Sequence, residues 1–231
     1  MRLKYDFSGS VVLVTGGASG IGAATALACE QAGATVVVAD VQGVSKKVDV
    51  ADPHAVRRFV DEILQEHGRI DAAVLAAAIQ KRTPVDEISD AEWRRHIAVN
   101  LDGVFYCIRE LVPVMKRQRR GAILSFTSGL VNMGWPGTAA YAASKGALIG
   151  LTKSVAQELR PYGVRVNVLS PGLAATGMFL GVSDAAEREM YERSVGVSPP
   201  EAVVPTIMHL ISDGSASMTG AVIERRMVPG R

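Results

Sequence analysis

Three side chains suited to acid–base chemistry lie close together in the second half of the chain. Tyr141 and Lys145 are four residues apart, and Ser128 precedes Tyr141 by thirteen residues. Side chains four apart share one face of a helix. An ammonium held beside a phenol favours the phenolate and lowers a tyrosine pKa that is normally about 10. The spacing therefore predicts a tyrosine that acts as a general base or acid near neutral pH.

A glycine-rich segment near the N-terminus predicts a place for a dinucleotide. Residues 15–22 read Thr-Gly-Gly-Ala-Ser-Gly-Ile-Gly, after an apolar run and at the start of a helical pattern. In that context Gly16 permits a tight turn, Gly20 lets the backbone approach phosphate, and Gly22 allows close helix packing. The helix N-terminus then faces the pyrophosphate. An ordinary glycine-rich turn is the alternative. Together with Tyr141 and Lys145, the segment indicates a nicotinamide-dependent oxidoreductase.

Asp40 bears on which dinucleotide the chain would take. It ends the second apolar run, eighteen residues beyond Gly22. A carboxylate at this place accepts hydrogen bonds from the ribose hydroxyls of adenosine. It would repel a 2′-phosphate, and neither Ser19 nor Val41 is a basic residue that could bind one. The pattern favours NAD over NADP, and a helix-cap or turn role for Asp40 is the alternative.

Apolar strand patterns alternate with helical patterns along the whole chain. Strands are predicted at residues 11–14, 35–39, 47–50, 70–76, 122–126, 164–169 and 222–225, and helices at 21–32, 53–67, 138–160 and 200–211, with helical stretches around 91–116. Strands this apolar indicate a parallel sheet covered on both faces. We predict an α/β fold: one doubly wound Rossmann domain over residues 1–231, with six to seven parallel strands flanked by helices.

The connection after Asp40 is unusually short for this architecture. Only five residues separate Asp40 from Lys46, whereas a crossover between parallel strands normally needs a dozen or more. Two explanations remain open at this point. Either the usual helix is missing and an extended return replaces it, or the third strand is short and marginal.

Composition argues against several other classes of protein. The chain has 25 basic and 23 acidic residues, so neither nucleic acid nor an anionic membrane is an expected partner. No apolar run is long enough to span a bilayer, and the N-terminus is too polar for a secretion signal. Cys29 and Cys107 form no close-spaced motif, which predicts reduced, buried thiols in a cytoplasmic protein. No catalytic metal is expected, because the histidines lack ligand spacing.

These motifs together resemble the short-chain dehydrogenase/reductase family in its classical form, from about Phe7 to Gly220. Residues 15–22 match the family's cofactor motif in full, and Tyr141 and Lys145 match its YxxxK pair. The resemblance implies that Asn100, Ser128, Tyr141 and Lys145 are catalytic. It implies that the cofactor contacts Gly16, Ser19, Gly20, Ile21, Gly22, Asp40, Asp49, Val50, Ala78, Tyr141, Lys145, Pro171, Gly172 and Thr176.

The resemblance also implies a role for each catalytic residue. Tyr141 would take the proton from a substrate hydroxyl while hydride leaves the adjacent carbon for the nicotinamide, and Ser128 would orient the same oxygen. Lys145 would lower the tyrosine pKa and hold the nicotinamide ribose. Asn100 would anchor a water that passes the proton to solvent, although a buried structural amide is the alternative. We interpret Ser125 and Ser144 as bystanders.

Two segments depart from the family pattern. The family usually has Asn-Asn-Ala-Gly after its fourth strand, where this chain has Leu-Ala-Ala-Ala at 75–78. The change removes hydrogen bonds that brace the sheet and places Ala78 beside the cofactor in place of glycine. The usual Val-Asp-Gly-Gly near the C-terminus becomes Arg-Arg-Met-Val at 225–228, which puts the family's tetramer packing in doubt.

The substrate is predicted only by class. Met133, Trp135 and Pro136 precede Tyr141, and Met178, Phe179 and Leu180 begin a segment that often covers substrate in the family; core or interface packing explains them equally well. The leading hypothesis is an NAD-dependent dehydrogenase of a small or medium secondary alcohol.

Alternatives are an NADPH-dependent 3-oxoacyl-thioester reductase and a non-catalytic NAD-binding sensor. A homodimer or homotetramer is expected from an apolar stripe, Leu148, Leu151, Val155 and Leu159, although packing against the sheet would also account for it.

Overall fold

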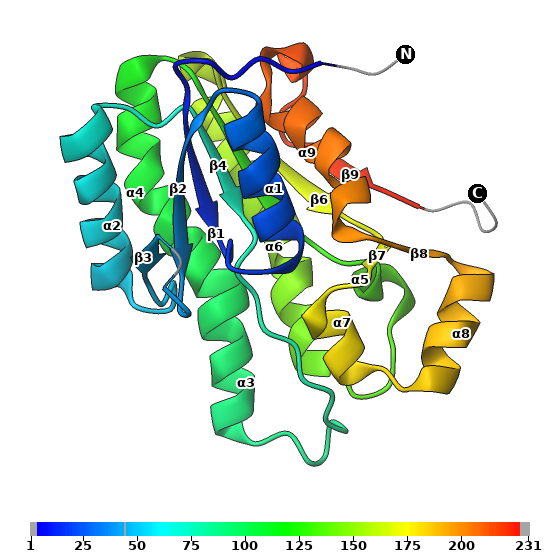
Figure 1. Ribbon diagram of the computed structural model, residues 1–231. Coiled ribbons are helices and arrows are strands. Elements are labelled where there is room, and N and C mark those ends of the chain that lie inside the picture. Colours follow the sequence, from blue (N-terminus) through cyan, green and yellow to red (C-terminus); the bar gives the residue numbers. More distant parts are fainter. Residues whose placement is uncertain (1–3, 44, 227–231) are drawn as a thin grey trace.

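The computed structural model describes residues 4–43 and 45–226, and its centre is a seven-stranded parallel sheet (Figure 1). The strands are β1 Val11–Thr15, β2 Thr35–Asp40, β3 Lys46–Lys47, β4 Ala72–Leu75, β5 Gly121–Phe126, β6 Val164–Ser170 and β9 Val222–Glu224. They lie in the order β3-β2-β1-β4-β5-β6-β9. The α/β fold, the parallel sheet and its strand number confirm the prediction.

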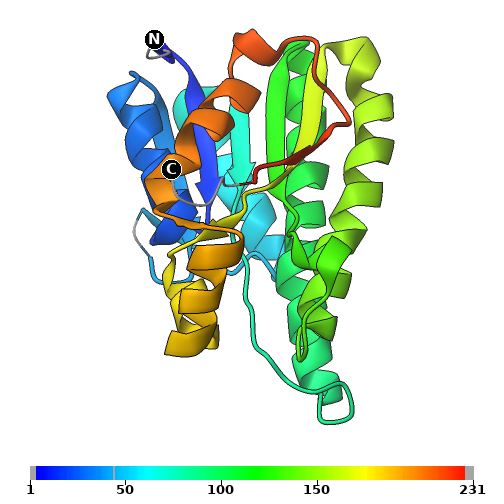
Figure 2. The same ribbon diagram turned by 90° about the vertical axis from the view of Figure 1, so that its right-hand side faces the viewer.

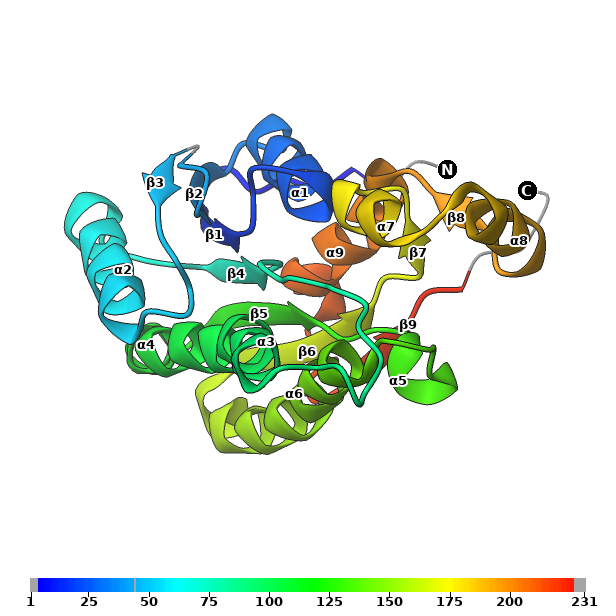
Figure 3. The same ribbon diagram turned by 90° about the horizontal axis from the view of Figure 1, so that it is seen from below.

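Helices cover both faces of this sheet (Figure 3). Helices α1 Gly20–Gln31 and α9 Val204–Ile211 pack on one face, and α2 Pro53–His67, α4 Gly103–Gln118 and α6 Ala139–Leu159 pack on the other. Alternate residues of each strand enter opposite cores, so Leu13 joins the core under α2, α4 and α6, whereas Val12 and Val14 join the core under α1 and α9. The continuous apolar strands seen in the sequence therefore reflect burial on both faces.

Shorter elements extend the chain beyond the carboxyl ends of the strands (Figure 2). They are α3 Asp90–Ile97, a π-helical turn Ala98–Asp102, α5 Leu130–Met133, α7 Gly177–Val182, α8 Ala185–Ser194 and a small parallel pair of β7 Leu173–Ala174 with β8 Val197–Ser198. The 3₁₀ turns are Arg160–Tyr162 between α6 and β6, Pro200–Ala202 before α9, and Asp213–Ser215 after α9. The predicted helix at 200–211 is thus a 3₁₀ turn followed by α9. The order of strands reverses between β1 and β4, and the loops that leave these two strands diverge there.

Both explanations of the short connection after Asp40 apply. No helix lies among the described residues between β2 and β3, and β3 has only two residues. The Asp40 carbonyl accepts hydrogen bonds from the amides of Gly43 and Val48, at 3.2 and 3.0 Å. A tight turn therefore returns the chain to the edge of the sheet.

The burial of side chains tests the predictions for the apolar stripe of α6 and for the two cysteines. Leu148, Val155 and Leu159 are at most 9% exposed and belong to the core under α6, and Leu151 packs against that core. Packing against the sheet thus accounts for the stripe that suggested self-association. Cys29 and Cys107 are buried free thiols as predicted, and burial raises the pKa of each to about 12. Within residues 4–43 and 45–226, the helices are too short or too polar to cross a bilayer.

Gly22→Ala and Gly150→Ala form a matched test of the close packing between α1 and β1. A Cβ on Gly22 would lie 2.2 Å from the Gly16 carbonyl oxygen, whereas a Cβ on Gly150 would meet nothing within 4 Å. Gly22→Ala should lower the free energy of unfolding by about 1–3 kcal/mol. Gly150→Ala should raise it by about 0.5–1 kcal/mol, because alanine favours an exposed helix interior. Urea denaturation of the unliganded proteins measures both, and equal effects would contradict the packing argument.

Candidate active site

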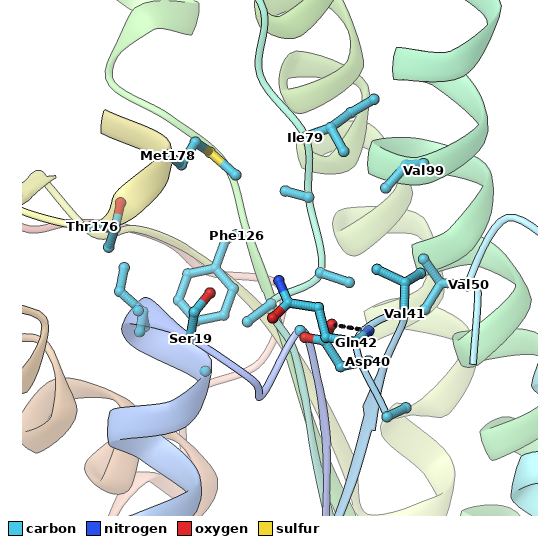
Figure 4. Close-up of a pocket in the computed structure, with 18 of the residues that line it drawn as sticks. Ser19, Asp40, Val41, Gln42, Val50, Ile79, Val99, Phe126, Thr176 and Met178 are labelled. Carbon is cyan, nitrogen blue, oxygen red and sulfur yellow. Dashed lines mark hydrogen bonds between the residues drawn. The ribbon is translucent and has the colours of Figure 1, made fainter. Parts of the chain in front are cut away.

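A cavity of about 370 Å³ lies at the carboxyl ends of β1, β2, β4 and β5 (Figure 4). Every residue that the sequence predicted to contact a cofactor lines it, apart from Gly172. Asp40, Val41, Val50 and Val99 lie toward one end, and Thr176 and Met178 lie toward the other. Tyr141 and Lys145 also line the cavity, whereas Ser128 and Asn100 stand outside its wall. The fold thus brings the predicted cofactor residues together from segments far apart in the sequence.

Glycines shape the floor of this cavity. Gly16 has a φ of +70°, and a Cβ there would lie 2.6 Å from the Ala77 amide nitrogen. A Cβ on Gly20 would lie 3.0 Å from the methyl group of Thr176, which lines the same cavity. The loop after β1 therefore lies directly on the loop after β4, and the N-terminus of α1 opens at the cavity. Backbone amides without side chains suit a pyrophosphate, so the cradle fits a dinucleotide.

Asp40 is held in place by two backbone amides. Its carboxylate accepts a hydrogen bond from the Ala18 amide at 3.0 Å. It accepts another from the Gln42 amide, also at 3.0 Å (Figure 4). The first bond joins the end of β2 to the glycine loop, and the second forms the turn that leaves β2. The predicted alternative, a turn role, is thus part of what Asp40 does. The same carboxylate lines the cavity, so it presents a fixed negative charge there.

The loop after β4 is braced without the family's asparagines. The amides of Ala76 and Ala77 donate to the carbonyl and hydroxyl oxygens of Thr15, at 3.1 and 3.3 Å. Further along, Ile79 exchanges two hydrogen bonds with the Asn100 side chain. The departure at 75–78 therefore leaves the loop anchored from both sides.

Asn100 lies in the π-helical turn between α3 and α4 and is fully buried. Its Oδ1 accepts from the Ile79 amide at 2.8 Å, and its Nδ2 donates to the Ile79 carbonyl and to Ser144 Oγ at 2.9 and 3.1 Å. Ser144 in turn donates to the Tyr141 carbonyl at 2.7 Å. The Asn100 amide thus makes structural hydrogen bonds, and its catalytic role through a bound water stays a prediction. Ser144, expected to be a bystander, connects Asn100 to the tyrosine-bearing helix.

The prediction that the pKa of Tyr141 is lowered is wrong. Burial raises the pKa of Tyr141 to about 12, and a hydrogen bond with Ser128 opposes this only in part. Burial also lowers the pKa of Lys145 to about 8, because desolvation penalises its ammonium. The two side chains lie on one helix as the spacing predicts, but desolvation of the phenol has the largest effect on the pKa of Tyr141. Tyr141 therefore carries its proton at neutral pH.

Four contacts hold the segments that line the cavity near Tyr141. Thr127, at the end of β5, donates through its hydroxyl to the Lys145 carbonyl at 3.0 Å. On the far wall, Thr176 caps α7, and Arg225 holds the Pro171 carbonyl at 3.2 Å and Ser198 at 3.1 Å. Arg225 thus anchors the segment beside the cavity; Met227 and Val228 lie outside the described residues.

An ion pair joins helix α8 to the loop after β4. Arg82 Nη1 donates to both carboxylate oxygens of Glu187, at 2.8 and 2.7 Å, and both side chains are about one-fifth exposed. Beside it, the Tyr191 ring stacks obliquely on Trp135 and meets the edge of Phe179. Trp135 and Phe179 therefore hold α7 and α8 in place.

Met178 lines the cavity as predicted, whereas Met133 is 69% exposed.

Several residues of this site were not predicted from the sequence. Gln42, Arg95, Phe126 and Thr127 line the cavity, and Arg82 joins two segments near it. Phe126 and Thr127 lie between the predicted strand end and Ser128, so their position in the sequence could have pointed to them. Nothing in the local pattern distinguishes Arg82 or Arg95 from the other basic residues.

Lys145→Met tests the cost of burying an ammonium. Below pH 8 the native protein holds a charged, desolvated Lys145, and this penalty disappears as pH rises from about 8 toward the ordinary lysine value of about 10.5. The variant should therefore be more stable than the wild type at pH 7, on the order of 2–3 kcal/mol. The difference should shrink between pH 8 and 10.5. Urea denaturation across this pH range measures the difference in stability. The control is Lys153→Met, which changes an exposed lysine on the same helix. A difference that does not depend on pH would contradict the lowered pKa of Lys145.

Arg82→Met tests whether the ion pair holds α7 and α8. Partly buried, charge-assisted hydrogen bonds contribute about 1–3 kcal/mol. Amide hydrogen exchange over residues 177–194 should therefore quicken by about fivefold to a hundredfold. Arg193→Met, which removes an exposed pair with Glu189 on α8, is the matched control and should change little. If both variants behave alike, the Arg82 pair does not anchor the segment.

Known proteins match this chain over nearly its whole length. Residues 16–224 match the family model described as enoyl-(acyl carrier protein) reductase. The chain is 37% identical to the 3-oxoacyl-[acyl-carrier-protein] reductase of Thermotoga maritima, covering 96% of this chain and 97% of that protein. It is also 37% identical to the 2,3-dihydro-2,3-dihydroxybenzoate dehydrogenase of Escherichia coli, covering 93% and 94%.

Solved structures agree with these relatives. The crystal structure of levodione reductase is similar with a TM-score of 0.87 and 26% identity, over 95% of this chain and 97% of that one. Sequence and structure comparisons thus agree on one family of reductases and dehydrogenases. The chain belongs to the classical short-chain dehydrogenase/reductase family and is an NAD(P)-dependent oxidoreductase.

Proposed function

We propose that this protein is an NAD-dependent dehydrogenase that interconverts a small or medium secondary alcohol and its ketone. The observation that carries the choice of NAD is the Asp40 carboxylate, fixed by Ala18 and Gln42 at the cavity wall. A 2′-phosphate about 4 Å from this charge would lose about 1–4 kcal/mol. Neither Ser19 nor Val41 carries a charge that would compensate. NAD, which has a hydroxyl at this position, avoids the repulsion.

The residues of the cavity fit such a cofactor. Gly16, Gly20 and Gly22 leave room for close approach of a pyrophosphate, and Asp40 offers acceptors for ribose hydroxyls. Asp49 and Val50 would hold the adenine end, and Pro171, Gly172 and Thr176 the nicotinamide end. When bound, NAD supplies the hydride acceptor for alcohol oxidation. The protein contributes binding, orientation and control of the proton.

Proton transfer falls to Tyr141 in this proposal. Its phenol is protonated at neutral pH, which suits donation of a proton to the oxygen of a ketone during reduction. Ser128 hydrogen-bonds the phenol and would orient the substrate oxygen. In the oxidation direction the phenol must first lose its proton, so this direction should accelerate as pH rises. Lys145 would hold the nicotinamide ribose and stabilise the phenolate.

The substrate end of the cavity is apolar. Ile79, Phe126 and Met178 line it and offer no charged group. This lining supports a substrate whose reacting carbon bears hydrocarbon substituents. We propose a homodimer or homotetramer as the working assembly, on the strength of the family alone.

One rival function has support from the relatives. The Thermotoga maritima protein is named a 3-oxoacyl-[acyl-carrier-protein] reductase, and its identity to this chain equals that of the Escherichia coli dehydrogenase. An NADPH-dependent 3-oxoacyl-thioester reductase would need its 2′-phosphate beside Asp40. The Asp40 carboxylate therefore favours the NAD-dependent dehydrogenase.

Cofactor titration combined with Tyr141→Phe tests the proposal. NADH should bind at least about fivefold more tightly than NADPH, because repulsion by Asp40 is worth about 1 kcal/mol or more. With NAD and a panel of secondary alcohols, Tyr141→Phe should lower kcat by about a hundredfold or more and affect NADH binding far less. Tyr162→Phe, whose ring packs against Lys116 away from the cavity, is the control.

Each other result has a definite meaning. If NADPH binds more tightly and 3-oxoacyl thioesters are reduced, the protein is an NADPH-dependent 3-oxoacyl-thioester reductase and not the proposed dehydrogenase. Binding of NADH without any turnover that depends on Tyr141 would favour a sensor.

A further inference from the structure

A buried histidine lies on α3, four residues before Asn100. His96 is 1% exposed, and its Nε2 accepts from the Lys81 amide at 3.2 Å. Its Nδ1 lies 3.0 Å from the Glu92 carbonyl oxygen. An amide only donates and a carbonyl only accepts, so both contacts require a neutral imidazole with its proton on Nδ1.

His96 and Asn100 hold neighbouring points of the loop after β4. Asn100 exchanges two hydrogen bonds with Ile79, and His96 accepts one from Lys81, two residues further along. Residues 76–79 of this loop line the active-site cavity. The two side chains therefore fix the loop at the place where it leaves the cavity wall.

Protonation of His96 would break this arrangement. Nε2 would then carry a hydrogen that points at the Lys81 amide, and two donors would face each other. The new charge would be buried, which costs free energy unless a carboxylate pairs with it. Over the part of the chain that the structure describes, the His96 ring bonds only to the Lys81 amide and the Glu92 carbonyl.

The charged groups around His96 do not remove this cost. α3 packs against the loop after β4 and against α6 (Figure 3). The titratable side chains on these segments include Glu92 and Arg95 on α3, Lys81 and Arg82 on the loop, and Tyr141 and Lys145 on α6. Glu92 attracts a charge on His96, but its carboxylate already accepts from Lys81 Nζ at 2.6 Å. The other groups are cations or a neutral phenol.

We propose that neutral His96 positions the cavity wall formed by the loop after β4, and that protonation of His96 releases this wall. Histidine is the side chain whose charge ordinarily changes between about pH 5 and 8. The released state binds one more proton than the held state, so the held state is favoured as pH rises. His96 is thus a positioning residue that makes the cavity wall depend on pH.

Hydrogen exchange of the amides in residues 79–83 tests this role without any ligand. Protection, the ratio of intrinsic to observed exchange rate, is compared between about pH 8 and pH 5. In the wild type it should fall by about two- to tenfold at pH 5, the effect of losing one hydrogen bond. In His96→Gln it should be equal at both pH values, because the glutamine carbonyl accepts from the Lys81 amide but does not titrate. His96→Leu lacks an acceptor and should show low protection at both.

His54→Gln is the matched control, because His54 is exposed on the first turn of α2. This variant should keep the wild-type loss of protection at pH 5. The α4 amides of residues 104–115 are the internal control and should stay protected throughout. An equal pH effect in the wild type and His96→Gln would overturn the proposal. A loss that extends equally over α4 would also overturn it, because it reports general unfolding. The comparison with His96→Gln decides even if His96→Leu does not fold.

Fluorescence titration with NADH measures the consequence for the cavity, and this part rests on the proposed function. NADH binding should weaken between pH 8 and pH 5 by about two- to tenfold more in the wild type than in His96→Gln. The same pH dependence in both proteins would overturn the role of His96 at the cavity. If neither protein binds NADH, the proposed cofactor fails, and the exchange measurement alone decides whether neutral His96 holds the loop.

Discussion

The close approach of two backbone segments at the carboxyl edge of the sheet is the constraint on which the rest of the site depends. Gly16 lies against the Ala77 backbone, and Gly22 lies against the Gly16 carbonyl, so neither position has space for a Cβ. This contact sets the floor of the cavity between β1 and β4. It also brings the N-terminus of α1 and the end of β2 to the same place, where Asp40 binds the Ala18 amide.

A network of hydrogen bonds connects this cavity floor to the helix that carries Tyr141 and Lys145. Asn100 holds Ile79 on the loop after β4, and through Ser144 it holds the carbonyl of Tyr141 on α6. Thr127 connects the end of β5 to Lys145. The cofactor cradle and the acid–base residues are thus parts of one hydrogen-bonded frame. Burial within this frame sets the protonation states, because it favours a neutral phenol and destabilises the ammonium.

Much of the fold was predictable because its signals are local. Apolar runs of β-branched residues act within a few residues of chain. So do the ends of α2, where the Asp52 carboxylate accepts from the His54 amide and Gly68 adopts a left-handed conformation. Boundaries were less accurate where backbone patterns compete: the segment 200–211 begins with a 3₁₀ turn, and the helical stretch around Asn100 contains a π-helical turn. Among site residues, those in motifs were found, whereas Arg82 and Arg95 were missed because their partners are remote in sequence.

The sequence by itself determined the parallel α/β architecture, the glycine cradle, the residues on one face of α6 and the family that these motifs indicate. Only the tertiary structure decided the protonation of Tyr141 and Lys145, since desolvation depends on everything packed around a group and not on a partner four residues away. It also decided that Asn100 anchors a loop and that Leu148 and Leu159 belong to the core. These properties arise from contacts between distant segments, which no local pattern encodes.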